Sequence, residues 1–436
     1  MSIMEKFQFP RNIKTIIKVV GVGGGGGNAV TNMYQEGIHD VSFALCNTDS
    51  QALERSAVPV KICLGPTVTF GGGAGNDPEV AKAAALESEN EIRTLLSDGT
   101  KMVFITAGMG GGTGTGAAPV IARIAKEMDI LTVGIVTIPF LWEARSKIIQ
   151  ALYGVDEIRK NVDALLVVNN DRLSRIYPDL TLTNAFKKAD NTLTIAAKSI
   201  AELITLPGII NLDFADVKTT MKNGGVALMS NGFGEGERRL EQAIEEAFRS
   251  PLLNSNNVFA AKKILFNLSF SSEAELKMEE LDFVKDFMAR FDPLIEVIWG
   301  YGLDETLGQK VKFTVLATGF GLDSIPQISK TGQEQTSTGV KGGLTEDEVS
   351  EIMDILYGEN GDNQQFLSVP RSSIVILTLE EMDNEQIITM LEDNPTYSRD
   401  SKLIKQTRDK IANEIAGNLF VEISEEAPNK QTKIRF

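Results

Sequence analysis

The chain has few of the residues that build disulfide frameworks and metal centres. Its 436 residues include two cysteines, Cys46 and Cys63, and one histidine, His39. Both cysteines lie in or near apolar runs, which predicts buried free thiols in a reducing compartment rather than a disulfide framework. The histidine has no cysteine or second histidine beside it, and this argues against a metal-binding or general-base role for it.

Long apolar runs and an excess of basic residues are also missing. No segment approaches the roughly 18 apolar residues of a transmembrane helix, and the amino terminus has no signal-peptide core, so we expect a cytosolic protein with no direct membrane insertion. The formal net charge of −16 argues against a nucleic-acid partner. The same charge repels phosphates, so a phosphorylated ligand requires local N–H groups, helix dipoles and a cation such as Mg²⁺.

Glycine, in contrast, is concentrated in three segments near the ends of strand-like runs. Residues 21–28 (GVGGGGGN) follow the run 16–20 and contain the G-x-G-x-x-G pattern of dinucleotide-binding turns. Residues 71–75 (GGGAG) precede a helical stretch at 78–96, and residues 108–116 (GMGGGTGTG) follow the run 103–105. Three such loops suggest a nucleotide with several phosphates lying across one sheet edge.

The segment 108–116 has the features of a phosphate cradle. Glycines let backbone N–H groups turn toward phosphate oxygens, Thr113 and Thr115 add hydroxyl donors, and a helix expected to begin near Pro119 points its positive dipole end at the anion. A lysine-bearing P-loop is absent from the sequence. A flexible turn is the plain alternative. A Rossmann-type oxidoreductase would explain 21–26 but leaves 108–116 without a role.

The order of apolar runs predicts an α/β protein. Short β-rich runs at 16–20, 41–45, 103–105, 131–136 and 164–168 alternate with helical stretches, which indicates a parallel sheet that binds ligands at its carboxyl edge. A long helical pattern follows at 182–206. The next region predicts a smaller α/β unit with a helix starting at Leu212, a turn at 232–236, a helix at 237–249 and strands at 263–269, 294–301 and 311–318. Residues 322–436 are acidic and polar, and predict a largely disordered tail.

Several separated motifs resemble the FtsZ family of the tubulin superfamily of GTPases. They are GGGTGTG at 110–116 within FITAGMGGGTGTGAAPVIA, the amino-terminal IKVVGVGGGGGNAV, and NLDFAD at 211–216. The resemblance covers residues 13–321. It implies an N-terminal extension (1–12), a GTP-binding domain (13–181), a central helix and the start of the synergy loop (182–211), a GTPase-activating domain (212–321), and a linker and tail (322–436) with a possible docking peptide at 391–399.

The resemblance also implies a function. Members of this family are cytoskeletal GTPases that bind GTP or GDP with Mg²⁺, assemble head to tail into protofilaments of the bacterial division ring, and hydrolyse GTP at the subunit interface. It implies a cytoplasmic protein at the division site, whose tail binds membrane tethers and division regulators. The alternative is a filament-forming scaffold of the same fold that binds nucleotide and turns it over little.

Carried over by position, the resemblance assigns nucleotide-binding residues. Glu143 would bind the ribose, Phe186 would stack on guanine, and Asn170 and Asn191 would read its edge. The family usually has arginine where this chain has Lys147, and aspartate where it has Asn191; the neighbouring Asp190 can take the latter role. The full set of nucleotide contacts implied is Gly24, Gly25, Gly26, Gly27, Asn28, Asn47, Asp49, Ala74, Gly75, Gly110, Gly111, Gly112, Thr113, Gly114, Thr115, Gly116, Glu143, Lys147, Asn170, Phe186 and Asn191.

The candidate catalytic residues are Asp213, Asp216 and Asn211. From the sequence, Asn211 can cap a helix that begins at Leu212, and the two aspartates share one face of its first turn. Such acidic residues commonly just complement a helix dipole. The family resemblance instead implies that they project into the nucleotide pocket of the next subunit and polarise the attacking water.

Overall fold

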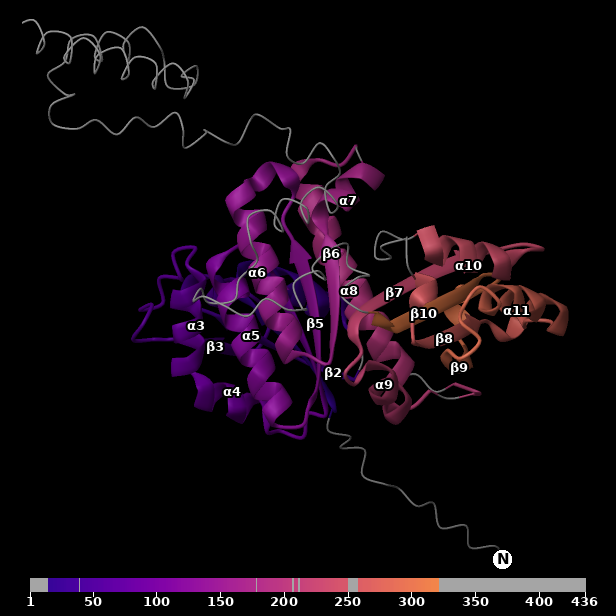
Figure 1. Cartoon of the computed structure of the whole chain (residues 1–436), viewed down its shortest axis with the longest axis horizontal. Coiled ribbons are helices and arrows are strands. Elements are labelled where there is room, and N and C mark those ends of the chain that lie inside the picture. Colours follow the sequence, from indigo (N-terminus) through magenta and orange to yellow (C-terminus); the bar gives the residue numbers. More distant parts are fainter. Residues whose placement is uncertain are drawn as a thin grey trace, which may run out of the picture. The chain divides into compact units, whose positions relative to one another are not determined.

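The computed structural model describes residues 15–320, with the exception of 39, 178, 206–207, 211 and 250–257 (Figure 1). The predictions for the N-terminal extension, His39, Asn211 and the tail therefore lie outside the described residues. In the part that is described, no helix is both long enough and apolar enough to cross a membrane.

The first half contains the predicted parallel sheet. Its spatial order is β3-β2-β1-β4-β5-β6, with all neighbours parallel. The sequence does not predict β3, because this strand is short and largely exposed and so lacks an apolar run. The strands are β1 (Ile17–Val22), β2 (Val41–Asn47), β3 (Val60–Cys63), β4 (Met102–Gly108), β5 (Leu131–Ile138) and β6 (Ala164–Asn169).

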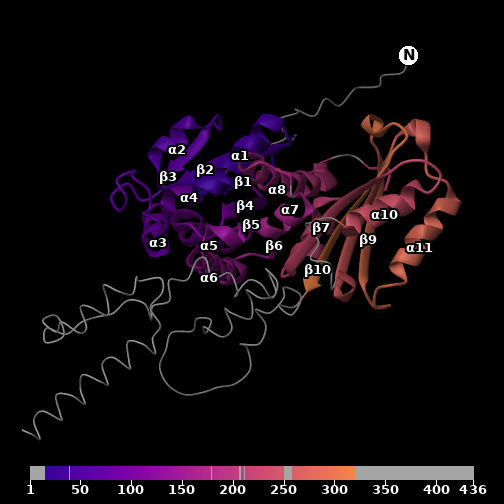
Figure 2. The same ribbon diagram turned by 90° about the horizontal axis from the view of Figure 1, so that it is seen from above.

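Helices cover both faces of this sheet, which is why its strands are apolar on both sides. Alternate residues of β4 enter two separate cores: Val103 and Ile105 lie in one, Met102 and Phe104 in the other. Figure 2 shows α1 and α8 on one side and α5 and α6 on the other. The helices are α1 (Gly23–Glu36), α2 (Ser50–Arg55), α3 (Pro78–Glu87), α4 (Glu89–Leu96), α5 (Gly112–Glu127), α6 (Arg145–Asn161), α7 (Asn170–Ile176) and α8 (Leu182–Thr205), with a 3-10 turn η1 (Leu141–Glu143).

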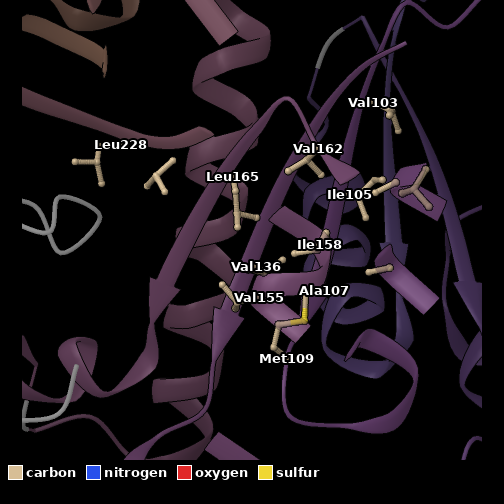
Figure 3. Close-up of a cluster of buried hydrophobic side chains, with 14 of the residues drawn as sticks. Val103, Ile105, Ala107, Met109, Val136, Val155, Ile158, Val162, Leu165 and Leu228 are labelled. Atoms are coloured by element: carbon tan, nitrogen blue, oxygen red, sulfur yellow. The ribbon is translucent and has the colours of Figure 1, made fainter. Parts of the chain in front are cut away.

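The core on the α5–α6 side packs both helices against the sheet. Val155 and Ile158 of α6 face Ile105 and Ala107 of β4 in this cluster (Figure 3). Met109, directly after β4, belongs to the same cluster and is 4% exposed. The loop that follows β4 is therefore anchored at its first residues.

Two of the helices predicted for this half differ from the structure. The helix expected near Pro119 begins at Gly112, and Pro119 lies inside it. The glycine run itself forms the first turn, and because glycine is a poor helix former the sequence does not reveal this start. The predicted helix at 78–96 is broken at Ser88, whose hydroxyl accepts a hydrogen bond from Gly65 N–H at 3.0 Å.

The second half extends the same sheet in the order β7-β10-β8-β9. β7 pairs with β6 in parallel, β10 is antiparallel to β7 and β8, and β9 is parallel to β8. Its elements are α9 (Phe214–Met221), β7 (Gly225–Gly234), α10 (Arg239–Arg249), η2 (Val258–Ala260), β8 (Lys263–Phe270), η3 (Ser272–Ala274), η4 (Met278–Leu281), α11 (Asp282–Met288), β9 (Glu296–Leu303), η5 (Glu305–Leu307) and β10 (Val311–Phe320).

The predicted turn at 232–236 is largely a strand, because β7 continues to Gly234. Its glycines allow α10 to lie directly on the strand. A Cβ on Gly232 would be 1.9 Å from the carbonyl oxygen of Ala243, and one on Gly234 would be 1.7 Å from that of Arg239. Close approach of two backbones, rather than a turn, explains these glycines.

Candidate functional site

Two glycine runs meet at the carboxyl edge of the parallel sheet. α1 begins directly after β1, α5 begins shortly after β4, and β1 and β4 are neighbours. A Cβ on Gly25 would lie 3.3 Å from the Cα of Gly108, and one on Gly23 would lie 2.9 Å from the nitrogen of Gly114. The two helix N-termini are therefore side by side, and their unpaired N–H groups and positive dipole ends face the same space.

The glycines of the site fall into two groups, according to what an added side chain would meet. A Cβ on Gly26 would be 2.1 Å from the carbonyl oxygen of Thr106, and one on Gly116 would be 1.9 Å from that of Pro78. These glycines are needed for backbone packing. A second group would meet nothing within 4 Å, so its members border open space available to a ligand: Gly24, Gly27, Gly75 and Gly111.

The two threonines of the phosphate cradle already make internal hydrogen bonds. The hydroxyls of Thr113 and Thr48 are 2.7 Å apart, with Thr48 fully buried. The hydroxyl oxygen of Thr115 accepts from Gly110 N–H at 2.9 Å. Besides any bond to a ligand, these side chains hold the loop in shape.

The third glycine loop is tied to the end of β2. Gly73 N–H donates to the carbonyl oxygen of Thr48 at 3.1 Å. Asp49 caps α2, because its carboxylate accepts from Ala52 N–H at 3.1 Å, and the side-chain oxygen of Asn47 accepts from Asp49 N–H at 3.3 Å. Asn47 and Asp49, two of the predicted nucleotide contacts, thus stabilise the loop on which they lie.

A cavity of about 140 Å³ lies between the start of α1 and the end of β2. It brings together residues that are separate in the sequence. Four of the predicted nucleotide contacts line it, namely Gly24, Gly27, Asn28 and Asn47. Ala74 of the third loop approaches the other run, since a Cβ on Gly112 would lie 3.1 Å from the Ala74 side chain.

An aromatic cluster marks the other end of the edge. Phe140 and Trp142 stack with ring centroids 5.5 Å apart, and Phe186 of α8 meets both rings edge-on at 5.3 and 6.2 Å. Trp142 is 52% exposed and Phe186 is 40% exposed. Large aromatic rings left open to solvent next to a polar site offer a surface on which a base can stack.

Glu143 and Lys147 lie beside this cluster. The Glu143 carboxylate accepts from Phe140 N–H at 3.0 Å, and the Lys147 Nζ is 3.5 Å from its second oxygen. The ion pair joins the short turn η1 to the first turn of α6. The candidate ribose ligand and the candidate phosphate ligand are thus neighbours.

Asn170 and Asp190 present polar groups that are largely buried. Asn170, the first residue of α7, is 6% exposed, and its Oδ1 has no hydrogen-bond partner within the described residues. Burial raises the pKa of the Asp190 carboxyl to about 6. Asn191 beside it is half-buried. A buried acceptor without a donor costs about 1–3 kcal/mol, which a ligand N–H can recover.

Asp213 and Asp216 lie at the start of α9, where the sequence prediction needs correction. The helix begins at Phe214 rather than Leu212, so its N-cap is Asp213 and not Asn211. Asp213 Oδ1 accepts from Asp216 N–H, and Asp216 Oδ2 accepts from Asp213 N–H, both at 3.0 Å. Two aspartates can form this reciprocal capping box, which we did not anticipate from the sequence.

This helix lies toward the edge of the sheet opposite the glycine loops. Lys222, at the end of α9, is 3.3 Å from Asp129, which precedes β5. The next strand starts at Gly225, whose N–H donates to the carbonyl oxygen of Asp163 ahead of β6. Both contacts are at the amino ends of parallel strands. β5 has eight residues and so separates the two edges by about 26 Å.

Gln150 of α6 is a residue that the sequence analysis did not single out. Its side-chain amide contacts carbonyl groups of the phosphate cradle, including that of Gly111 at 3.1 Å. No motif identifies it. Its i+3 spacing from Lys147 places these two residues on one face of α6 and was the available signal.

Three family descriptions match this sequence. "Tubulin/FtsZ family, GTPase domain" matches residues 16–178, "FtsZ family, C-terminal domain" matches 225–321, and "FtsZ, C-terminal" matches 370–414.

Relatives and solved structures agree with these matches. A cell division protein FtsZ of Porphyromonas gingivalis is 52% identical over 418 residues, covering 93% of this chain and 91% of the relative. FtsZ 1 of Thermococcus kodakarensis is 46% identical, covering 70% of this chain and 81% of the relative. A solved FtsZ dimer of M. jannaschii superposes with a TM-score of 0.66 at 39% identity, covering 76% of this chain and 96% of that one.

Proposed function

This chain belongs to the tubulin/FtsZ family, and on that premise we propose that it is a cell-division GTPase that assembles head to tail and completes its active site only between subunits. The observation that carries the proposal is the placement of the glycine loops and of α9, whose first turn carries Asp213 and Asp216, toward opposite edges of one sheet. A head-to-tail contact of this kind does not close on itself, so it produces filaments.

The nucleotide would lie along the carboxyl edge. N–H groups of the two glycine runs would bind the phosphates, and the Lys147 ammonium group would add a positive charge. Mg²⁺, held mainly by phosphates and water, would offset the remaining charge. The packed glycines Gly26 and Gly116 and the open ones Gly24 and Gly111 together fit a backbone cradle of this type.

Base recognition would occur at the aromatic end. Phe186 offers a ring for guanine, and Asn170 offers a buried carbonyl oxygen as acceptor for a guanine N–H. Asp190 and Asn191 lie on α8 beside this region, and either oxygen can accept from the same edge of the base. Glu143 would bind the ribose hydroxyls.

The two aspartates would act on the nucleotide of the neighbouring subunit. Each uses one carboxylate oxygen in the capping box, which leaves the other oxygen available to orient and polarise a water molecule near the γ-phosphate. Phosphoryl transfer needs mainly positioning and charge stabilisation, so delivering these groups by assembly makes hydrolysis depend on the polymer.

The alternative is a filament scaffold with little turnover. Lys147 in place of arginine lacks the planar fork that binds phosphate in two places, and Asn191 lacks charge assistance. Phosphate release measured in parallel with sedimentation separates the two functions. Filaments that form with GTP and release phosphate support the GTPase, and filaments without release support the scaffold.

The decisive test uses Asp213→Asn and Asp216→Asn, since asparagine can still cap α9 through its side-chain oxygen. We expect each variant to bind GTP and sediment with it, while phosphate release falls by about a hundredfold. Asp304→Asn is the matched control, because Asp304 caps η5 in the same half of the chain by accepting from Thr306 N–H. This control should hydrolyse GTP at the wild-type rate.

A mixing experiment tests catalysis between subunits. Gly112→Val places a side chain against Asp77 N and should disable the pocket while leaving the aspartates intact. When this variant is mixed with Asp213→Asn, turnover should be restored. In one of the mixed contacts, the intact pocket of an Asp213→Asn subunit meets the intact carboxylates of a Gly112→Val subunit. Co-assembly without recovered turnover, or wild-type hydrolysis without a threshold concentration, would show that the site is contained in one subunit.

The tail would connect the filament to the cell envelope. Residues 391–399 lie within the segment 370–414 that matches the C-terminal description of the family. We propose that they bind membrane tethers in the cytoplasm at the division site. Deleting residues 322–436 should leave assembly and GTP hydrolysis largely intact and abolish tether binding; loss of assembly would overturn this role.

A further inference from the structure

The side chain of Gln150 links α6 to two loops of the phosphate end. Its amide nitrogen lies 3.1 Å from the carbonyl oxygen of Gly111, 3.4 Å from that of Gly110 and 3.3 Å from that of Asn76. Two amide protons are thus shared among three acceptors. The same side chain joins the cradle after β4 to the loop that leads into α3.

These carbonyls determine where the neighbouring N–H groups point. A peptide unit is planar, and in the trans form its C=O and N–H point in opposite directions. A donor that holds the carbonyls of Gly110 and Gly111 on the α6 side therefore directs the N–H groups of Gly111 and Gly112 away from α6.

Gly111 needs such a restraint more than Gly110. Gly110, with a φ of +101°, is closely packed, since an added Cβ there would lie 2.7 Å from the Pro139 ring, whereas an added Cβ on Gly111 would meet nothing within 4 Å. Glycine peptides with little packing around them rotate readily. Thr115 fixes the Gly110 N–H from one side, and Gln150 fixes the carbonyl groups from the other.

We propose that Gln150 is a positioning residue that presets the N–H groups of Gly111 and Gly112 toward the phosphates of the nucleotide. The inference rests on the proposed function, since it assumes that this edge binds a guanine nucleotide. Gln150 does not contact the nucleotide itself; it lowers the conformational freedom that the cradle loses when phosphates bind.

The surroundings of Gln150 allow a clean substitution. It lines an open groove of about 810 Å³ between α3, α5 and α6. A replacement of similar length therefore has room, and no core side chain is removed. Gln150→Met deletes the donor at nearly constant volume, whereas Gln150→Lys keeps a donor that can reach the same carbonyls. Gln35→Met, at an exposed position of α1, is the control for the effect of replacing glutamine by methionine as such.

The experiment measures equilibrium affinity for GDP and for guanosine, which has no phosphates. We expect Gln150→Met to weaken GDP binding by about tenfold, the equivalent of about 1.4 kcal/mol, and to leave guanosine binding unchanged. Gln150→Lys should bind GDP within threefold of wild type or more tightly, and Gln35→Met should match wild type.

Three results would overturn the inference. They are wild-type GDP affinity in Gln150→Met, an equal loss of GDP and guanosine affinity, and failure of lysine to restore GDP binding. The second would mean that the side chain merely supports the fold. Failure of the wild-type protein to bind GDP is a distinct outcome, because it would remove the proposed function itself.

Discussion

The phosphate end and the base end of the site are built from different parts of the chain. At the phosphate end, backbone lies against backbone, as where Gly26 approaches Thr106, and the threonine hydroxyls are already hydrogen-bonded. At the base end, side chains predominate: the Asn170 Oδ1 has no hydrogen-bond partner in the part of the chain that the structure describes, and Phe186 is 40% exposed. In the proposed function, the first end is complete before the ligand arrives, whereas the second would be completed by it. Affinity for phosphates and selectivity for the base should therefore respond to different substitutions.

The strongest test of this comparison is Gly26→Ala. Its Cβ would lie 2.1 Å from a backbone oxygen, so two buried segments would have to separate. We expect a loss of about 3 kcal/mol in the free energy of unfolding, together with loss of nucleotide binding. Gly27→Ala is the neighbouring control, because a Cβ at this position would meet nothing within 4 Å and alanine favours the helix. Urea denaturation of both proteins measures the difference; equal midpoints would refute the packing argument.

At the base end, the substitution Asp190→Asn should stabilise the fold rather than destabilise it. The pKa of Asp190 is raised by burial from 3.8 to about 6, so the folded protein binds a proton more tightly than the unfolded chain. This group therefore lowers stability as the pH rises from about 4 to 6. We expect the variant to be more stable than wild type by about 2 kcal/mol at pH 7.5, with the gap closing toward pH 4. A gap independent of pH would show that ionisation of Asp190 is not responsible.

Asn170→Ala should alter selectivity rather than stability of the cradle. Wild type should prefer GTP over ATP by roughly tenfold to a hundredfold, because adenine leaves the buried acceptor unpaired. In the variant, the ratio of GTP affinity to ATP affinity should fall by about tenfold. Direct titration with both nucleotides measures it, and Asn161→Ala, which only removes a bond to the Glu157 carbonyl oxygen, serves as control. Equal affinities of the wild type for GTP and ATP would contradict the assignment.

Lys147→Arg is expected to have the smallest effect, because it changes a half-exposed group. Its ion pair with Glu143, at 3.5 Å, is of the surface type that contributes little. The guanidinium fork should tighten GTP binding by about threefold at most. A gain much larger than this would show that the lysine limits nucleotide affinity, which would favour the scaffold alternative.

The contrast between a backbone cradle and a side-chain site also explains which parts of the fold and of the site could be predicted from the sequence. Backbone cradles require glycine at fixed positions, and buried parallel strands require apolar runs, so both leave a local pattern. The pattern does not reveal why each glycine is present. Gly232 looks like a turn residue and is instead a contact with Ala243, and only the packing of α10 on β7 distinguishes these roles.

Side-chain roles that depend on distant partners could not be predicted. Gln150 reaches Gly111 because α6 packs beside the cradle, and Asn170 is buried without a partner for its Oδ1 among the described residues, which depends on tertiary packing. The start of α9 was missed for a more local reason. Asn211 and Asp213 are both good caps, and the second aspartate at Asp216 decides the choice through its reciprocal bond.

The stacked pair Phe140 and Trp142 gives the protein a built-in optical reporter. The chain has two tryptophans. Trp142 lies at the base end, half-exposed beside Phe186, whereas Trp299 stacks on Phe266 in the second half. Indole emission depends on contact with water and with neighbouring rings. In a Trp299→Phe background, the remaining emission should therefore follow the arrival and departure of the proposed base at this edge in real time, without an attached dye.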